Sequence, residues 1–319
     1  MIQYEPQLAT LVKAPPEGDA WLHEIKYDGY RMGCAITADG VRLTSRNGQD
    51  YTAALPEIVA EAKTLTMTSA LLDGEVVVLL EDGRASFQAL QHALSVKAGA
   101  GLTTGNYVQA RAGLVYLVFD LLEIDGESLL DTPLEARKAR LRALVAHGGN
   151  RRIRYADHVV GHGGAFFAQA TRLGVEGIVS KRRDGAYQPG RRSGWLKMKC
   201  LREQPFVIGG YTDQEGTIGG LGALLVGLYD GDRLIFAGRV GTGFTQKIGH
   251  SLLDALRPLA RKTSPFDPPP AGPLARSAHF VEPTLVCRVA FAEWTDDHKI
   301  RHPVYRGLAK NVDARGCTR

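Results

Sequence analysis

The sequence predicts a two-part protein, in which a mixed α/β domain over residues 1–202 precedes a small all-β barrel domain over residues 203–319. Three observations support this fold class. Strand-like and helix-like segments alternate through the first part, and several strand segments adjoin one another as hairpins. After residue 202 the segments become short, β-rich and separated by Gly-rich turns. We therefore expect largely antiparallel sheets in the first part and one barrel in the second.

The strands expected in the first part are rich in β-branched and aromatic residues. They cover residues 30–36, 41–45, 70–80, 114–124 and 177–182. Helical segments lie between them at 86–94, 132–148 and 163–174. The segment at 132–148 has the clearest limits, because Thr132 can cap it, Pro133 suits its first turn and Glu135 completes a capping box. Gly148 would end this helix, and Gly174 the next one.

In the second part, strands are expected at 206–212, 222–230, 233–243 and 285–294. One helix is expected at 245–261, and a Pro-rich loop follows it. Short strands with Gly-rich turns and a single helix are typical of a small β-barrel.

The composition is that of a soluble globular protein, with 44% hydrophobic and 23% charged residues among 319. The N-terminus has no basic head followed by an apolar stretch, and the longest apolar segment is too short to span a membrane. The cysteines, Cys34, Cys200, Cys287 and Cys317, are widely spaced, which fits a reducing cytoplasm better than disulfides or a zinc cluster.

Positive charge is clustered along the chain. The net charge is +5 and the isoelectric point about 9.0. Residues 181–202 hold eight Lys or Arg and one acid, and residues 137–154 hold seven basic residues and no acid. Such clusters favour a polyanionic partner such as nucleic acid, although a solvated helix face gives the same pattern.

The stretch HEIKYDGYR, residues 23–31, holds the first candidate residue for catalysis. Lys26 stands two residues before an Asp-Gly pair and five before Arg31. In isolation the stretch reads as a solvated lysine beside a hairpin turn, because Asp and Gly tolerate positive φ. A lysine held at the mouth of a pocket can also attack phosphorus in its neutral form. Arg31 could then bind a nucleotide.

Two acidic residues are candidates for a metal site. Glu75 follows Asp-Gly at the start of a buried strand, and Glu176 precedes the strand at 177–182. Two carboxylates at strand ends could hold one divalent cation, with water completing its shell. An edge carboxylate beside a turn is the plain alternative.

Three cations and one aromatic residue complete the pattern. Lys197 and Lys199 alternate with apolar residues, so strand periodicity places both lysines on one face. Arg46 follows a strand in Ser-Arg-Asn-Gly, and Phe119 lies in a strand, where it could stack on a base. Two cations on one face suit phosphates, and they also suit a solvated surface.

The order of these motifs resembles the series found in ATP-dependent DNA ligases. Lys-x-Asp-Gly, Ser-Arg-Asn-Gly, Asp-Gly-Glu, Phe-Asp, Glu-Gly-Ile-Val-Ser-Lys and Trp-Leu-Lys-Met-Lys follow one another. The opening stretch, the barrel segments and the tail IRHPVYRGL resemble the ligase portion of the bacterial ligase D group. The resemblance covers residues 8–308. It implies a nucleotidyltransferase (adenylation) domain over 1–202 and an OB-fold domain over 203–319.

The resemblance also implies roles for individual residues. Lys26 would take AMP from ATP, Glu24 would border the adenine, and Phe119 would stack on it. Glu75 would reach the ribose and a divalent metal, Mg or Mn, and Glu176 would bind the metal.

The remaining residues would meet phosphates. Arg31 and Arg46 would contact the ribose, the phosphates or the 5′-phosphate of a nick, and Lys197 and Lys199 would bind the phosphates of ATP. In the final motif, Arg301 and Arg306 would help to orient the leaving pyrophosphate.

We therefore expect an ATP-dependent DNA ligase that seals nicked duplex DNA through lysyl-AMP in repair or end joining. A monomer in the bacterial cytoplasm, associated with the nucleoid, fits this function, and a Ku-type end-binding protein is the partner that the resemblance suggests. The chain shows no polymerase or nuclease segment and reads as a stand-alone ligase, with a tail after Leu308 of atypical charge. The alternatives are an RNA ligase, a capping guanylyltransferase and a catalytically silent DNA-binding protein.

Overall fold

The computed structural model describes residues 2–95, 110–146, 152–214, 220–295 and 297–319. The chain divides into two compact units, Met1–Cys200 and Leu201–Arg319. Over the described residues, no helix is long and apolar enough to cross a membrane.

The first unit contains a five-stranded sheet with the order β1-β11-β10-β2-β9. All its pairings are antiparallel except the parallel pairing of β1 with β11. Its strands are β1 (Gln7–Leu11), β2 (Trp21–Lys26), β9 (His158–Val160), β10 (Gly177–Arg182) and β11 (Gly190–Lys199).

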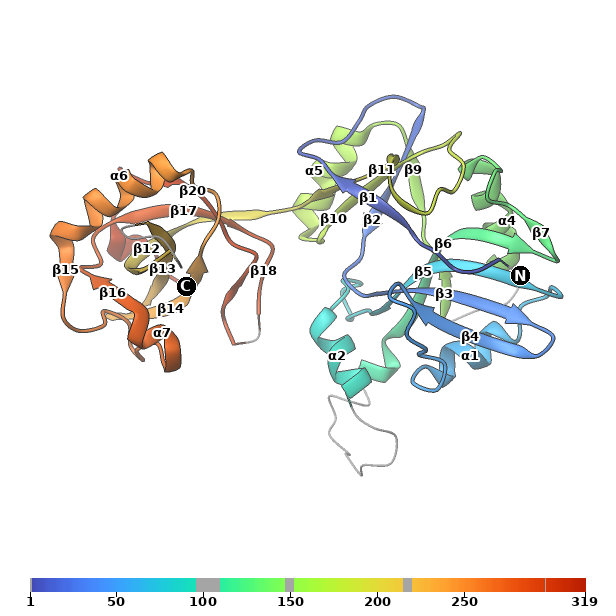
Figure 1. Ribbon diagram of the computed structural model, residues 1–319, viewed down its shortest axis with the longest axis horizontal. Helices are drawn as coiled ribbons and strands as arrows, with labels where there is room; N and C mark the ends of the chain where they lie inside the picture. The colour runs from blue at the N-terminus through green and yellow to red at the C-terminus, as the bar shows by residue number, and fades with distance from the viewer. Residues whose placement is uncertain (1, 96–109, 147–151, 215–219, 296) are drawn as a thin grey trace. The chain divides into compact units, whose positions relative to one another are not determined.

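A six-stranded sheet forms the rest of the first unit, with the order β4-β3-β5-β6-β7 and β8 paired with β6. Only the β6–β8 pairing is parallel. Its strands are β3 (Tyr30–Thr37), β4 (Gly40–Ser45), β5 (Ala70–Val78), β6 (Leu114–Ile124), β7 (Glu127–Ser128) and β8 (Ile153–Tyr155). In Figure 1 this sheet lies below the five-stranded one.

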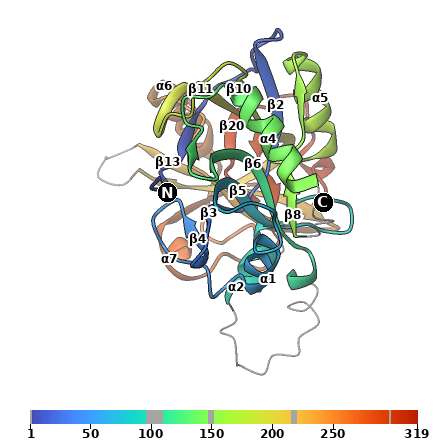
Figure 2. The same ribbon diagram turned by 90° about the vertical axis from the view of Figure 1, so that its right-hand side faces the viewer.

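Helices cover the outer faces of the two sheets. In Figure 2, α5 lies beside β2 and β10, whereas α1 and α2 lie beneath the six-stranded sheet. Helix α4 packs on β6 and β8. The bounds are α1 (Pro56–Ala62), α2 (Phe87–Ser95), α4 (Leu134–Ala146) and α5 (Gly163–Leu173). The end predicted for α5 is confirmed, because Gly174 takes a φ of 68° there; the end predicted at Gly148 lies outside the described residues.

The two Asp-Gly pairs do not form hairpin turns, which rules out the alternative interpretation of the stretch around Lys26 as a lysine beside a hairpin. Strand β2 pairs with β10 and β9, and β3 pairs with β4 and β5, so Asp28-Gly29 connects one sheet to the other. Asp73-Gly74 lies inside β5, where the register with β6 shifts by a bulge. The periodicity of one strand does not reveal which sheet the next strand joins.

An apolar cluster joins the two sheets of the first unit. Leu71 and Leu122 come from β5 and β6, and Trp195 comes from β11. Tyr187, from the loop before β11, completes the buried set. This cluster holds the inner faces of the sheets together at one place and leaves a polar pocket beside it.

The second unit is a β-rich domain. Its main sheet has the order β14-β13-β12-β16-β15, with β17 paired with β12 and β20 paired with β17. The strands are β12 (Arg202–Asp213), β13 (Leu221–Asp230), β14 (Arg233–Val240), β15 (Ala260–Arg261), β16 (Ala278–Val281), β17 (Val286–Phe291) and β20 (Val304–Leu308). A hairpin of β18 (Glu293–Trp294) and β19 (Ile300–Arg301) and the helices α6 (Gln246–Leu256) and α7 (Gly272–Ser277) complete it.

The predicted fold class is confirmed, with an antiparallel α/β unit followed by a β-rich one. The end strands β14 and β15 do not pair with each other within the described ranges, so the sheet is not a closed barrel there. An isolated bridge between Leu234 and Phe266 connects β14 to the segment that follows β15.

Helix α4 differs from its predicted form. The Glu135 carboxylate accepts a hydrogen bond from Arg183 at 2.6 Å, and the Thr132 N–H donates to the Leu129 carbonyl, so the predicted capping box does not form. Arg137 is fully buried and lies against Asp120 at 2.7 Å. Part of the basic cluster at 137–154 is therefore neither solvated nor available to a polyanion.

Candidate active site

A pocket of about 450 Å³ lies between the two sheets of the first unit. Seven residues predicted to bind the nucleotide line it: Glu24, Lys26, Arg31, Arg46, Glu75, Phe119 and Lys197. These residues come from β2, β3, β5, β6, β11 and the loop after β4. Glu176 and Lys199 are not lining residues, but both lie beside Lys26 in the five-stranded sheet.

Lys26 is the last residue of β2, and its ammonium is ion-paired with the Glu176 carboxylate. The sheet register explains the pairing, because Lys26 lies opposite Gly177 on β10 and Glu176 immediately precedes that strand. The two side chains retain 22% and 20% of their exposure, so neither is fully buried by the pair.

Gly29 fixes the connection that follows Lys26. A Cβ on this glycine would lie 2.2 Å from the Val76 carbonyl oxygen and 3.1 Å from the Glu75 side chain. The chain leaving β2 therefore packs directly on the backbone of β5. This contact sets the distance between the Lys26 end of β2 and Glu75.

Glu75 has an unusual environment for a carboxylate. Burial raises its pKa to about 7, while the charges of Lys26 and Arg31 oppose the rise and those of Asp73 and Glu176 add to it. Burial also raises the pKa of Glu176, against the effect of Lys26. The charge of Glu176 thus disfavours ionisation of Glu75, and the nearby positive charges offset this only in part.

No group of three or more His, Cys, Asp or Glu side chains forms a metal site within the described ranges. A cation at Glu75 and Glu176 would therefore depend on water or phosphate oxygens for its other ligands, as magnesium often does. The raised pKa values of both carboxylates fit an additional positive charge at this place.

Lys197 and Lys199 share one face of β11. Lys197 lies opposite Val179 of β10, and Lys199 lies opposite Gly177. Lys26 lies opposite Gly177 from the other side of β10, so the three lysines share one face of the sheet. Burial lowers the pKa of Lys197, and the neighbouring charge of Lys26 lowers it further. Leu196 and Met198 point to the opposite face, where they pack with Ala170 of α5 and Ile178 of β10. Three ammonium groups thus gather at one end of the sheet.

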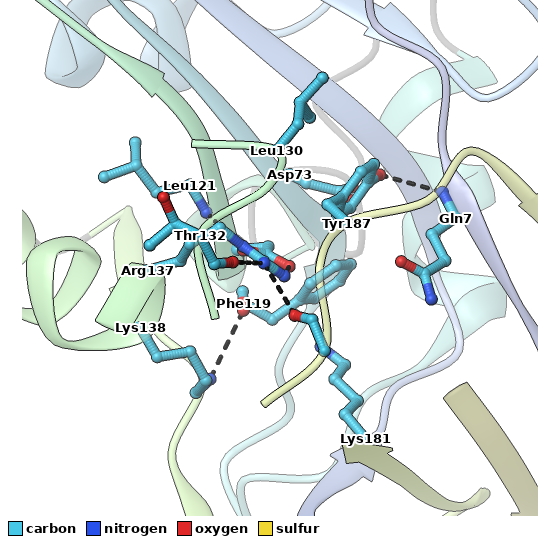
Figure 3. A network of polar contacts seen from close by, with 12 residues as sticks. Gln7, Asp73, Phe119, Leu121, Leu130, Thr132, Arg137, Lys138, Lys181 and Tyr187 are labelled. Carbon is cyan, nitrogen blue, oxygen red and sulfur yellow. Dashed lines mark hydrogen bonds and ion pairs between the residues drawn. The ribbon is translucent and has the colours of Figure 1, made fainter. Parts of the chain in front are cut away.

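Arg31 lines the pocket, yet most of its donors are used inside the protein. Its Nε and Nη2 donate to the two Asp73 oxygens at 3.0 and 2.6 Å, and Nη1 donates to the Gln7 carbonyl at 2.5 Å. Asp73 also accepts hydrogen bonds from Tyr4 at 2.8 Å and Tyr187 at 2.7 Å. Tyr187 and Gln7 lie side by side in Figure 3. Arg31 therefore ties β3 and β5 to β1.

A buried ionic cluster lies behind Phe119. Lys181 is 4.2 Å from the centre of the Phe119 ring and 4.1 Å from that of Trp195. Its ammonium pairs with Glu24 at 2.6 Å, and Lys138 holds the other Glu24 oxygen at 2.5 Å. Burial alone would raise the pKa of Glu24, but the two lysines outweigh it and lower the pKa. The Glu24 side chain is thus directed toward this cluster.

Arg301 and Arg306 belong to the second unit. Arg301 ends β19 and pairs with Glu293 at 2.7 Å, whereas Arg306 is an exposed residue of β20.

Sequence reasoning missed several residues of the pocket region. No role was assigned to Asp73, Tyr187, Trp195, Lys138 or Lys181. Strand alternation gives a signal for Trp195, because it precedes Lys197 by two residues and shares its face. Lys138 carried no such signal, since its partner Glu24 is 114 residues away in sequence.

Comparison with known proteins agrees with the two-unit structure. Residues 6–199 match the model of the ATP dependent DNA ligase domain, and residues 217–311 match that of the ATP dependent DNA ligase C terminal region. The "Multifunctional non-homologous end joining protein LigD" of Pseudomonas aeruginosa is 39% identical over 98% of this chain and 36% of that protein. The corresponding DNA repair protein of Mycobacterium tuberculosis is 37% identical over 95% of this chain and 38% of that protein.

A solved structure titled "mycobacterial DNA ligase D complexed with ATP and MES" is 35% identical, with a TM-score of 0.56 over 99% of this chain and 98% of that one. This chain spans less than two-fifths of the length of the curated relatives above.

The fold, with a nucleotide-sized pocket between two sheets and a β-rich second unit, defines an enzyme of the nucleotide-dependent ligase class. The chain belongs to the family of ATP-dependent DNA ligases. The resemblance noted from the motif series, including that to the ligase D group, is confirmed.

Proposed function

We propose that this ligase seals nicks in duplex DNA and that Lys26 is the nucleophile that carries AMP. One observation carries the proposal: Lys26 lies in the same pocket as six other residues that the motif series assigns to the nucleotide. In this proposal residues 1–202 are the adenylation domain and residues 203–319 the OB-fold domain.

Three phosphoryl transfers make up the proposed reaction. The neutral amine of Lys26 forms a P–N bond with the α-phosphorus of ATP while the bond to pyrophosphate breaks. A 5′-phosphate oxygen of the nick then displaces Lys26 from AMP. Finally the 3′-hydroxyl attacks the 5′-phosphate, and AMP leaves as the phosphodiester forms.

The side chains around Lys26 have separate tasks in this proposal. Lys197, Lys199 and Arg46 offset the charge of the phosphates, and Phe119 stacks on the adenine, which Glu24 borders. Arg31 acts mainly by holding β1, β3 and β5 together, and it contacts the nucleotide with its remaining donor. Arg301 and Arg306 orient the pyrophosphate.

A divalent cation, Mg²⁺ or Mn²⁺, would be held by Glu75 and Glu176 and would supply positive charge beside the phosphates. The supporting observations are that Glu75 lines the pocket with Lys26 and that Glu176 pairs with Lys26.

We extend the proposal to end-joining repair because the relatives named above carry that name. The protein would act as a monomer in the bacterial cytoplasm, at the nucleoid, with a Ku-type protein at the DNA end. Binding to nicked duplex should weaken steeply as salt increases, since phosphate contacts would provide most of the affinity.

The direct test is incubation with α-labelled ATP and Mg²⁺ or Mn²⁺, followed by a denaturing gel. Wild-type protein and the Lys13→Ala control should carry label, and Lys26→Ala should not. The adduct should be labile to acid and stable to base. Label on Lys26→Ala would refute the assignment, and sealing of nicked RNA in preference to nicked DNA would favour an RNA ligase.

A further inference from the structure

Lys138 of α4 is a buried lysine that does not line the pocket. Its ammonium donates to the Glu24 carboxylate at 2.5 Å and to the Ala156 carbonyl at 3.1 Å. The Phe119 carbonyl lies 3.5 Å away, and the centre of the Tyr155 ring lies 4.5 Å away. Figure 3 shows the ammonium directed toward the backbone of Phe119. The Lys138 ammonium is thus surrounded by protein groups.

The contacts of Lys138 connect the two sheets that enclose the pocket. Helix α4 packs on β6 and β8, and the Phe119 and Ala156 carbonyls belong to that same side. Glu24 belongs to β2 of the other sheet and precedes Lys26 by two residues on the same strand face. One ammonium therefore joins the strand that ends in Lys26 to the backbone of the residue expected to stack on the base.

The stability of the fold does not account for this arrangement by itself. Removing two charges from water costs about as much as their attraction returns, so a buried pair often contributes little net stability. What such a pair does provide is a fixed geometry, because an ammonium satisfied by an anion and a carbonyl is held in one place. Lys138 thereby fixes the position of β2 relative to β6.

We propose that Lys138 is a positioning residue for the formation of lysyl-AMP, and that it acts through Glu24. It keeps the amine of Lys26 at the distance and angle to the base-stacking Phe119 that attack on the α-phosphorus requires. The inference rests on the proposed nucleophilic role of Lys26. A displacement of the nucleophile by about 1 Å can slow such a reaction by about 100-fold.

Single-turnover formation of lysyl-AMP at saturating ATP tests the proposal, with Lys138→Met compared with Arg140→Met. Arg140 lies on the same helix, but it pairs at the surface with Glu127 at 2.8 Å. We expect the rate of Lys138→Met to fall by about 10- to 100-fold with a much smaller change in the KM for ATP. Arg140→Met should keep the wild-type rate. A folded Lys138→Met protein with the wild-type rate would overturn the proposal.

A double-mutant cycle tests whether Lys138 acts through Glu24. The variants are Glu24→Gln, Lys138→Met and the combination of both, and Lys138→Met alone should fold because Glu24 keeps its ion pair with Lys181. The combined variant should form lysyl-AMP at the rate of Glu24→Gln, because the contact is already lost. A rate lower by a further tenfold would overturn the proposal. Label retained by Lys26→Ala would instead overturn the proposed function, so the two failures are distinguishable.

Discussion

The ammonium of Lys26 is ion-paired with the carboxylate of Glu176 across two neighbouring strands of one sheet. The proposed nucleophile is thus held by a proposed metal ligand. A nucleotide and a cation that bind here would compete with this pair for both groups.

Glu176→Ala should therefore reduce sealing of a nicked duplex by about 100-fold or more, because both the cation and the placement of Lys26 lose a partner. Circular dichroism should show an unchanged fold. Glu75→Ala should have an effect in the same direction. Normal sealing by both variants, or sealing by the wild-type protein in excess EDTA, would contradict the assignment.

Asp73→Asn should destabilise the first unit strongly. Asp73 is fully buried and accepts hydrogen bonds from Arg31, Tyr4 and Tyr187, so its neutralisation leaves the Arg31 charge uncompensated. The free energy of unfolding should fall by about 3–5 kcal/mol, as it does when one partner of a buried pair is removed. Urea unfolding measures the loss. Asp82→Asn, which breaks an exposed pair with Arg84, should leave the midpoint of urea unfolding nearly unchanged.

Gly29→Ala should reduce lysyl-AMP formation by displacing the backbone that holds Lys26. The added methyl group would meet the Val76 carbonyl at 2.2 Å, so the connection must move away from β5 and displace Lys26 from Glu75. We expect loss of lysyl-AMP formation in an assay with α-labelled ATP. Gly194→Ala is the matched control, because its nearest neighbour would be 3.6 Å away. Equal activity of the two variants would show that the close contact is not needed.

The buried charge of Lys181 should make stability depend on pH. Burial lowers its pKa to about 8, although Glu24 opposes the shift. Between about pH 8 and its ordinary value of 10.5, the unfolded chain binds a proton that the folded chain has released, so stability rises with pH in this window. The destabilisation is complete below about pH 8.

Lys181→Met should remove this rise. Urea unfolding of both proteins at pH 7.5 and pH 10 gives the comparison. A difference of up to about 3 kcal/mol between their pH responses is expected from the size of the shift. Parallel responses would mean that the ammonium titrates as it does in water.

Arg306→Ala should separate the first chemical step from the last. If Arg306 orients pyrophosphate, which leaves only when lysyl-AMP forms, the variant should form lysyl-AMP poorly. It should still seal a nick whose 5′-phosphate already carries AMP. Normal lysyl-AMP formation with weak sealing of that substrate would identify Arg306 as a DNA contact instead.

Much of the fold followed from periodicity and composition. The strands expected at 30–36, 114–124 and 177–182 are present, and so is the helix expected at 163–174. Strand β2 was not predicted, because His23 and Glu24 are buried on opposite faces by specific partners, Ser180 and Lys138. Alternation of polar and apolar residues cannot predict a strand whose polar side chains are buried and hydrogen-bonded inside the protein.

The site was predicted unevenly for the same reason. Lys26 ends β2, whereas Glu75 and Lys197 lie within β5 and β11, and each stands in a short motif that the sequence displays. Arg137 and Lys138 are adjacent in sequence and were counted as surface charge, yet both are buried against acids. Their partners are distant in the chain, and only tertiary structure brings them together.

The link between β2 and β3 also limits how far the pocket can open. Only Tyr27, Asp28 and Gly29 separate the last residue of one sheet from the first residue of the other. A fully extended chain advances at most about 3.6 Å per residue, so the four steps from Lys26 to Tyr30 reach no farther than about 14 Å. The covalent chain thus limits how far the two sheets can separate beside the nucleophile. A larger separation of the sheets must occur at the end of the pocket remote from Lys26.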